Sequence, residues 1–422
     1  MIRNRRLLSF LGIKDKIFYG WIVVASALLI SCLLVGTRFS FGIFFKSLEA
    51  EFSLSRTATS SIFSTYMVFY AIFALISGWV LDKYGPRITV ILMGLITGLS
   101  LLITSQVTSF WQLFLTYSLL LSMGTSGSVA VMMSVVARWF DKKRGFAIGI
   151  AISGAGLGTL IIAPFAAFLI STTDWRQSYV ILGTITLLLV ISLALLLKRD
   201  PRDIGTLPNG SSLNNREIVS VTNQTQPGFP GLSIIQALKT RSFWFLSAVR
   251  LLFSLYLNLL LTHVVPYATD SGIPVVQAAT FISIMSIFNI IAKLLTGKIS
   301  DKIGRKLPGI FASGLGAIAL IWLIWSHELW MFYIFAVIMG ISWGGLGLTI
   351  ITQPSDIFRG YRLGSIMGAL EVSIAIGAAM GSALGGFIFD ATGSYSLAFI
   401  IGSFALLLTI PLITYTRQET SG

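Results

Sequence analysis

The sequence is poor in the residues from which disulfides and metal centres are made. It holds a single cysteine, Cys32, and two histidines, His263 and His327, among 422 residues. One cysteine in an apolar run offers neither a disulfide nor a thiolate metal site, so we predict that Cys32 is a small buried hydrophobe. With two histidines and few carboxylates, a zinc or di-iron centre is not expected either. The sequence predicts no cofactor.

Charged side chains are also scarce. Only 11% of the residues are charged and 55% are apolar, whereas soluble proteins carry about 25% charged residues. Twelve apolar runs are long enough to cross about 30 Å of hydrocarbon. They fall near residues 18–44, 57–80, 88–107, 110–137, 145–170, 177–197, 243–267, 275–297, 307–325, 329–352, 364–389 and 394–415. The sequence therefore predicts an all-α membrane protein with twelve transmembrane helices.

One long polar stretch divides these runs into six and six. It extends from Lys198 to Arg241 and is rich in Pro, Gly, Ser and Asn, a composition typical of a flexible linker. We therefore expect an N-terminal six-helix bundle at 1–197, a cytoplasmic linker at 198–241 and a C-terminal six-helix bundle at 242–422.

The two halves repeat one another. The segments GWVLDKYGPR, from Gly78, and GKISDKIGRK, from Gly297, share the pattern G-x-x-x-D-x-x-G at an offset of 219 residues. The same offset relates glycines of the fifth run, Gly145, Gly149 and Gly158, to glycines of the eleventh, Gly364, Gly368 and Gly377. We expect two pseudo-symmetric bundles related by an axis along the membrane normal. Small residues at this spacing suit either static close packing or sliding of helices, and both remain open.

Lysine and arginine lie mainly on one side of the predicted bilayer. Of 30 such residues, 24 fall in the termini, the linker and alternate loops, and 3 lie on the other side. The positive-inside rule then places both termini in the cytoplasm of a multi-pass protein of the cell inner (plasma) membrane. The basic start leads into a run too long for a signal peptide. The net charge of +14 is thus explained by topology, and no nucleic-acid partner is expected.

Three polar residues form a stripe in the eighth run. Ser286, Asn289 and Lys293 are spaced i, i+3 and i+7, which places them on one helix face. A lysine in hydrocarbon costs about 3 kcal/mol, so Lys293 is expected to face protein or water. Its ammonium and the Asn289 amide can donate to a carboxylate. We predict that the stripe lines a cavity and binds an anion; the alternative is a structural ion pair of Lys293.

Two further charges lie at comparable depth. Glu371 is the one acid within a run, in the eleventh, and Arg250 lies in the seventh. If Glu371 pairs with Arg250, Lys293 is left for the anion; if Glu371 pairs with Lys293, Arg250 takes that role. Arg250 snorkelling toward the headgroups is a third alternative. Because burial disfavours a bare carboxylate, we predict that Glu371 couples transport to a proton.

Arg38 and His263 are the remaining candidates. Arg38 is the one charge inside a run of the first half, and it either meets the substrate across the pseudo-symmetry axis or sits at the outer interface, held by Thr37 or Ser40. His263, near the outer end of the seventh run, is either a hydrogen-bonded gate or packing residue or a second proton carrier.

The repeated loop pattern resembles the major facilitator superfamily, and the resemblance covers the whole chain. It implies that Asp82 and Asp301 brace a neighbouring helix on the cytoplasmic face and latch one conformation. The other residues of this predicted latch are Gly78, Gly85, Arg87, Gly297, Gly304 and Arg305.

A finer resemblance lies in the segment WFDKKRGFAIGIAISG, residues 139–154, which is similar to the signature of the monocarboxylate transporter family. Phe146 and Ser153 depart from it. In the eighth run that family places a carboxylate or Asn and then Arg, where this chain has Asn289 and Lys293; lysine keeps the charge but loses the bidentate fork. The first run opens with YGWIVV, which is similar to the other signature of that family but lacks its acidic residue. The residues that match the two signatures are Gly20, Trp21, Val23, Val24, Phe140, Lys142, Arg144, Ala147, Gly149, Ala151 and Gly154.

The resemblance implies a monomeric secondary transporter of small organic anions that works by alternating access. Proton symport of a monocarboxylate such as lactate or pyruvate is the predicted function. The alternatives are anion exchange, as in oxalate:formate antiporter-like relatives, drug efflux and a membrane sensor. Glu371 and the lack of a lysine in the eleventh run leave fewer cations for a dicarboxylate. An enzyme is not expected, because the sequence offers no nucleophile–base pair, metal set or phosphate loop.

Overall fold

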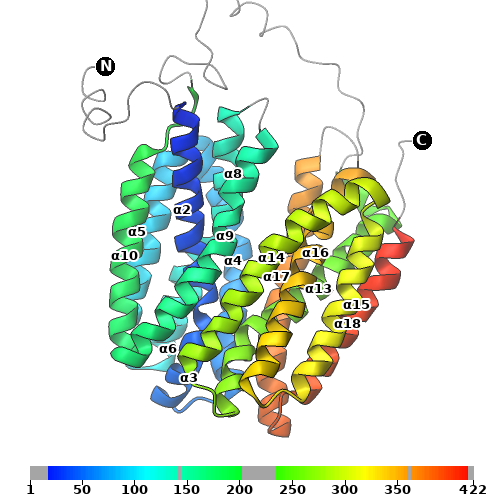
Figure 1. Ribbon diagram of the computed structural model, residues 1–422. Coiled ribbons are helices and arrows are strands. Elements are labelled where there is room, and N and C mark those ends of the chain that lie inside the picture. Colours follow the sequence, from blue (N-terminus) through cyan, green and yellow to red (C-terminus); the bar gives the residue numbers. More distant parts are fainter. Residues whose placement is uncertain (1–17, 141–143, 202–233, 359–362, 417–422) are drawn as a thin grey trace, which may run out of the picture.

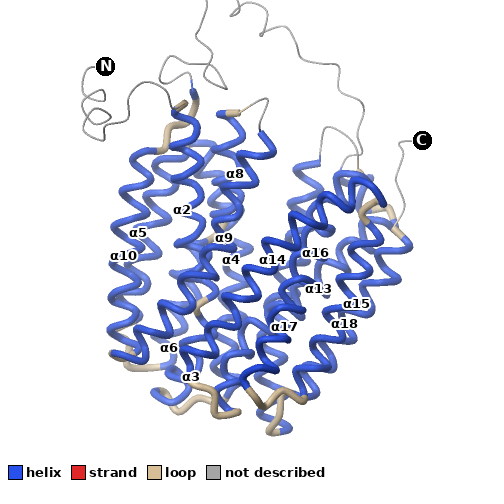
Figure 2. Tube along the Cα trace, in the orientation of Figure 1, coloured by secondary structure: helices blue, strands red, loops and turns tan. Residues whose placement is uncertain are grey.

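The computed structural model describes residues 18–140, 144–201, 234–358 and 363–416 (Figure 1). Within these ranges the chain is helical, with short turns and no strand, as Figure 2 shows by colour. Most of the predicted linker, 202–233, lies outside the described residues.

Twelve helical segments among the described residues are long and apolar enough to cross a membrane. In the first half, the first span consists of α2 (Tyr19–Phe39) and its continuation α3 (Phe41–Glu51). The fourth span is segmented into α6 (Phe110–Leu113), η1 (Phe114–Leu121), α7 (Ser122–Thr125) and α8 (Ser128–Trp139). The other four spans are single helices: α4 (Arg56–Tyr84), α5 (Pro86–Thr104), α9 (Arg144–Thr172) and α10 (Trp175–Leu196). Those of the second half follow the short α12 (Ile234–Leu238) and are α13 (Arg241–Asp270), α14 (Val275–Ile303), α15 (Lys306–Ile324), α16 (Leu329–Ile357), α17 (Leu363–Thr392) and α18 (Ser396–Tyr415). The predicted fold class is confirmed.

Local sequence explains where several of these helices begin and end. Ser55 and Asp174 cap α4 and α10 by accepting from backbone N–H groups of the first turn. The α4 and α14 helices end at Gly85 and Gly304, whose φ angles are 82° and 81° and whose ψ angles are 171° and 165°. Glycine is essentially the only residue that adopts this backbone conformation. The two motif glycines thus make the same turn in both halves.

The internal repeat is visible in helix packing. A Cβ on Gly158 of α9 would lie 2.3 Å from the Cys32 carbonyl oxygen of α2, and a Cβ on Gly377 of α17 would lie 2.2 Å from the Leu251 carbonyl oxygen of α13. Both pairs are related by the 219-residue offset. The small residues therefore allow close backbone contact at equivalent places, which fits the static-packing alternative at these two glycines.

A second equivalent contact is made with the partners exchanged. On α2, Gly36 faces Ile162 of α9, and a Cβ on Gly36 would lie 2.5 Å from the Ile162 Cγ1. In the second half the offset places Leu255 on α13 and Gly381 on α17, where a Cβ on the glycine would lie 2.0 Å from the Leu255 carbonyl oxygen. The glycine has moved from one helix of the pair to the other.

The fourth span differs from the single run predicted at 110–137. Its segment η1 is wound as a π-helix, Ser126 is extended and Gly127 has a φ of 67°. A residue in the left-handed region ends a helix, and glycine enters that region at least cost. The span is therefore broken between α7 and α8.

The described helices form two bundles, α2 to α10 and α13 to α18, which Figure 1 shows side by side. Contact between them is made mainly by α4 with α17 and α9 with α14, and also by α3 with α13. We call the end of the molecule that holds Glu51, Arg56, Asp270 and Thr392 the α3 end. The opposite end, where α2 begins and α18 ends, is called the termini end.

Candidate functional site

Near the α3 end, α4 and α17 are joined by a seam of small polar residues. Ser64 Oγ donates to the Ala379 carbonyl at 2.5 Å, and Ser382 Oγ donates to the Ser60 carbonyl at 3.3 Å. One turn nearer the end, Gly386 lies so close that a Cβ would be 2.4 Å from the Arg56 carbonyl oxygen. The two halves are therefore in direct contact along this part of the interface.

The helices α9 and α14 form the second seam. Ser283 Oγ donates to the Leu160 carbonyl at 2.9 Å, and the hydroxyls of Thr159 and Ser286 are 2.6 Å apart. Gly156 packs against Ile290 one turn further along. Beyond this level the contact ends, because a Cβ on Gly149 of α9 would meet no atom within 4 Å.

Lys293 lies on α14 one turn past Ile290, at the point where α9 and α14 separate. Its side chain is half-buried and has no hydrogen bond or ion pair with the described residues. Asn289, one turn earlier, is buried, and its side-chain nitrogen has no hydrogen-bond partner in the described part of the chain. The third member of the predicted stripe, Ser286, is occupied by Thr159 and by the Ile282 carbonyl. Two donors suited to a carboxylate are thus unengaged next to the place where the halves part.

The pairing that the sequence left open is made between Arg250 and Glu371. The Arg250 Nη1 lies 2.9 Å from the Glu371 Oε1, and Nη2 donates to the Ile350 carbonyl at 3.1 Å. The Arg250 side chain is 1% exposed, so it does not snorkel, whereas that of Glu371 is 61% exposed. Within the described part of the chain, Lys293 is therefore left without an acid.

Glu371 lies on the side of α17 that contacts the other half. Ala379 and Ser382, which bond to α4, follow it at helical spacing. They are in contact with α4, but Glu371 is exposed. The two halves have thus separated at its level, as they have near Lys293.

Arg38 is deeper in the first span than the sequence indicated, because the span continues through α3 to Glu51. Its guanidinium lies 4.4 Å from the Tyr70 ring centroid and 3.1 Å, at Nη2, from the Met67 sulfur. Its Nε is buried and has no hydrogen-bond partner among the residues that the structure describes. The Ser40 hydroxyl bonds to the Thr37 carbonyl instead of holding Arg38. Cation–π contacts of this kind attract a guanidinium electrostatically to the face of an aromatic ring.

His263 is fully buried and bonded at both ring nitrogens. Its Nε2 lies 2.8 Å from the Ser382 carbonyl, and its Nδ1 lies 3.1 Å from the Tyr395 hydroxyl. Since a carbonyl only accepts, Nε2 carries the hydrogen and Nδ1 accepts from Tyr395. This geometry fits the alternative of a hydrogen-bonded gate residue.

The predicted latch residues lie at the termini end. Gly85 and Gly304 form the turns described above. The Asp82 carboxylate is exposed and has no polar partner among the described residues, while its backbone carbonyl accepts from Arg199 Nη2 at 3.2 Å. The side chain of Asp301 lies outside what the structure describes. The remaining predicted latch residues with described positions are Gly78, Arg87, Gly297 and Arg305.

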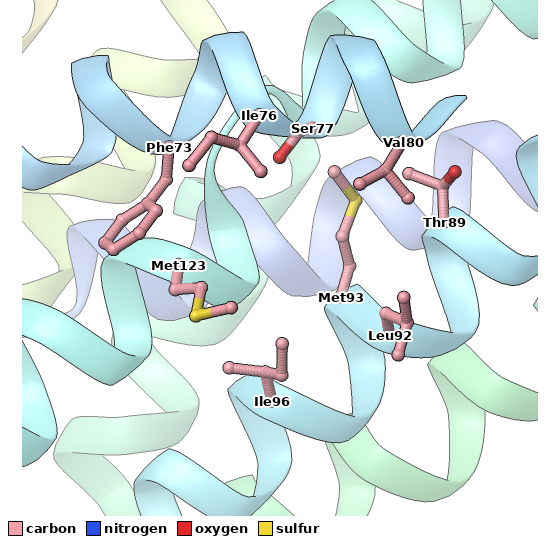
Figure 3. Close-up of a pocket in the computed structure, with 9 residues that line it drawn as sticks. All are labelled: Phe73, Ile76, Ser77, Val80, Thr89, Leu92, Met93, Ile96 and Met123. Atoms are coloured by element: carbon pink, nitrogen blue, oxygen red, sulfur yellow. The ribbon is translucent and has the colours of Figure 1, made fainter. Parts of the chain in front are cut away.

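A crevice between α4, α5 and α7 is the cavity drawn in Figure 3. It has a volume of about 70 Å³ and is lined by apolar side chains together with Ser77 and Thr89. Both hydroxyls are engaged, by Ser126 and by the Gly85 carbonyl. No charged side chain lines the crevice, so it does not suit an anion.

Sequence reasoning missed one cluster of charges at the α3 end, where Arg56 contacts Asp270 and Asp390 of the other half. The available signal was that Arg56 is one of only 3 cations on its side of the predicted bilayer. Its acidic partners could not be found from spacing, because they are separated from it by 214 and 334 positions.

Comparison with known proteins gives consistent results. The model of the Major Facilitator Superfamily matches residues 27–370. Monocarboxylate transporter 12-B of Danio rerio is 26% identical over 424 residues, covering 95% of this chain and 89% of that protein. Monocarboxylate transporter 12 of Homo sapiens is 26% identical over 416 residues, covering 94% of this chain and 80% of that protein. Monocarboxylate transporter 13 of Rattus norvegicus is 24% identical over 401 residues, covering 93% of this chain and 89% of that protein.

Among solved structures, a bacterial homolog of the human lysosomal transporter Spinster, in an inward-facing and unoccupied conformation, superposes with a TM-score of 0.71. The sequences are 18% identical, and the match covers 95% of this chain and 96% of that chain. At this identity the likeness shows a shared fold.

Proposed function

Because the chain belongs to the major facilitator superfamily, we propose that it carries a small organic anion across the plasma membrane by alternating access. The cargo we propose is a monocarboxylate of the size of lactate or pyruvate, moved together with a proton. Relatives named monocarboxylate transporters, which match nearly the whole chain, support this class of cargo.

The observation that carries the proposal is the amine of Lys293, which has no hydrogen bond or ion pair among the described residues. A lysine in a membrane-spanning helix is costly unless an anion or water reaches it, and Glu371 is already paired with Arg250. The unpartnered Asn289 amide one turn away supplies a second donor for the same carboxylate. Arg38 in the opposite half is the candidate for contact with the rest of the anion.

The arrangement of the two halves supports an opening at the termini end. The seams at Ser60–Ser382 and Thr159–Ser286 hold the α3 end together, while Gly149 and Glu371 lie where contact is lost. The bias of 24 cations to the termini side supports a cytoplasmic location of that end. Among the described residues the Asp82 carboxylate has no polar partner, which fits a released cytoplasmic latch. The site would then be open to the cytoplasm.

The Arg250–Glu371 pair supports coupling to a proton. Arg250 is buried, so removing the charge of its partner is costly unless another anion approaches. Protonation of the exposed Glu371 carboxylate and arrival of the substrate carboxylate therefore favour one another. Anion and proton would cross together, and the pair would re-form in the empty carrier.

The test is counterflow of labelled lactate, pyruvate and oxalate in proteoliposomes. Loss of a charged donor costs about 1.5–3 kcal/mol, so Lys293→Ala is expected to reduce monocarboxylate counterflow by about tenfold or more. Lys293→Arg should retain it. Lys298→Ala is the matched control, because this lysine is exposed on the same helix. Equal counterflow by wild type and Lys293→Ala would remove Lys293 from the site, and a wild type that exchanges only oxalate would support the dicarboxylate alternative.

A further inference from the structure

The α3 end is closed by charges that cross between the halves. The N-terminal half contributes Lys46 of α3 and Arg56, the first residue of α4. The C-terminal half contributes Asp270, the last residue of α13, and Asp390 near the end of α17. Lys46 Nζ is in ion-pair contact with Asp270, which also binds Arg56. One carboxylate therefore serves two cations of the opposite half.

Arg56 is almost enclosed by groups of the other half. Its Nη1 lies 2.6 Å from Asp270 Oδ2, and its Nη2 lies 3.0 Å from Asp270 Oδ1, so the pair is bidentate. The same guanidinium donates to the Tyr395 hydroxyl at 2.7 Å and lies 3.8 Å from the Phe389 ring centroid. From its own half it contacts Glu49 at 3.3 Å. Its side chain is 7% exposed.

Asp390 holds the start of α4 in a different way. Its Oδ1 accepts from the backbone N–H of Arg56 at 3.0 Å, and its Oδ2 accepts from that of Thr57 at 2.8 Å. These N–H groups belong to the first turn of a helix and have no partner within it. A carboxylate is also favoured there by the helix dipole. The second half thus caps a helix of the first.

Behind these charges the interface is tightly packed. Tyr395, which accepts from Arg56, donates to His263, and His263 donates to the Ser382 carbonyl. The Ser382 hydroxyl in turn bonds to Ser60 of α4. A continuous set of hydrogen bonds therefore joins the charged rim to the α4–α17 seam.

We propose that Arg56, Asp270 and Asp390 form an α3-end clamp, which holds this end closed and must be released for substrate to pass there. The proposal goes beyond cargo and coupling, because it requires only that the protein alternate between two states. Asp270 is 31% exposed and Glu49 is 24% exposed, so water reaches the rim and can hydrate the charges as they separate. The clamp is therefore suited to repeated opening, unlike a fully buried charge cluster.

The experiment measures how readily the α4–α17 seam becomes accessible to a water-soluble reagent. Cys32 is the one cysteine of the chain, so replacing it by serine gives a thiol-free background. Ser382→Cys then places a reporter at a residue that is 0% exposed between the halves. The protein is held in lipid nanodiscs and alkylated with a membrane-impermeant maleimide. We expect Arg56→Gln, Asp270→Asn and Asp390→Asn each to raise the rate, the first two by about tenfold, because the closed state loses a bidentate pair.

A second reporter distinguishes opening from local loosening. Gly149→Cys lies on α9 in open space in the present state, and alternation predicts that its alkylation slows when the α3 end opens. Arg176→Gln is the matched control, since Arg176 pairs with Glu51 at 2.7 Å within one half. It should change neither rate.

The outcomes separate cleanly. A faster reaction at Ser382→Cys with a slower one at Gly149→Cys supports the clamp. Unchanged alkylation in both Arg56→Gln and Asp270→Asn would overturn it, and so would acceleration at Ser382→Cys alone. Thermal unfolding of each variant identifies any that fails to fold, and the remaining aspartate variants still decide. Because no substrate is needed, the result is independent of the proposed cargo.

Discussion

Glu371 is the residue to which we assign proton coupling. Glu371→Gln keeps the shape and one oxygen for Arg250 but cannot take up a proton. We expect uptake of labelled lactate to lose its stimulation by a pH gradient, while counterflow at equal pH continues. The measurement compares uptake into proteoliposomes with and without an imposed gradient.

The matched control is Glu328→Gln, because Glu328 lies in the turn before α16 and contacts Trp330. It should respond to the gradient like the wild type. Unchanged proton-driven uptake by Glu371→Gln would contradict the assigned role. If the wild type itself ignored the gradient yet exchanged anions, the exchanger alternative would hold.

Candidate site residues could be predicted from the sequence where a charged residue lies within an apolar run. Lys293, Arg250 and Glu371 stand out because any charge inside an apolar run is costly. Their pairing was not predictable, because it depends on how α13, α14 and α17 are rotated about their axes. Arg56 and Asp270 were missed because they lie at the ends of runs, where charged residues are ordinary.

At the scale of helices, the close glycine contacts should be sensitive to one added methyl group. A Cβ on Gly377 would lie 2.2 Å from the Leu251 carbonyl oxygen, so α13 and α17 would have to move apart. Overpacking of this kind costs about 1–3 kcal/mol. We expect Gly377→Ala to lower the thermal unfolding temperature of the purified protein.

Gly314→Ala provides the comparison, since a Cβ at Gly314 in α15 would meet nothing within 4 Å. Alanine favours a helix over glycine by about 0.8–1 kcal/mol, so this change should be neutral or stabilising. An equal loss in both variants would mean that the packing at Gly377 is not the cause.

Helices were predictable in number but less so in extent. Apolar runs locate the spans because a segment that crosses the hydrocarbon core must be apolar. The α14 helix nevertheless extends to Ile303, beyond the predicted run, which ends at residue 297. A helix does not end where it leaves the bilayer but where its backbone turns, here at Gly304. The break in the fourth span was missed although the segment Gly124 to Ser128, GTSGS, carried a turn signal. Hydropathy does not report backbone conformation.

For the whole molecule, alternating access predicts that the halves must part at both seams. The Thr159 and Ser286 hydroxyl oxygens are 2.6 Å apart across α9 and α14, so cysteines at both positions should form a disulfide in the present state. In a Cys32→Ser background we expect the oxidised Thr159→Cys, Ser286→Cys protein to lose transport. Reduction should restore it.

A cross-link within one half is the control. The Ser77 and Ser126 hydroxyl oxygens are 3.1 Å apart inside the first bundle, so a disulfide between cysteines there should leave transport largely intact. If the bundles move as rigid bodies, only the cross-link between positions 159 and 286 inhibits transport. Full transport by the oxidised Thr159→Cys, Ser286→Cys protein would exclude a moving α9–α14 interface.

The overall architecture could be predicted from the sequence because the two halves carry the same motifs. The 219-residue offset between these motifs identifies equivalent helices without knowledge of contacts. The state of the molecule did not follow. Which end is closed depends on many weak contacts between distant segments, and the alternating access that we propose requires the same sequence to support both arrangements.

The exchange of Gly36 and Ile162 for Leu255 and Gly381 has a consequence for how such proteins diverge. In each pair a glycine leaves its helix backbone bare at the contact, where it meets the Ile162 side chain in the first half and the Leu255 backbone in the second. Selection then acts on the combined size of the two residues at the contact and not on either residue alone. Two bundles that descend from one ancestor can therefore keep the same distance between the axes of two packed helices while the residues at their closest contact diverge.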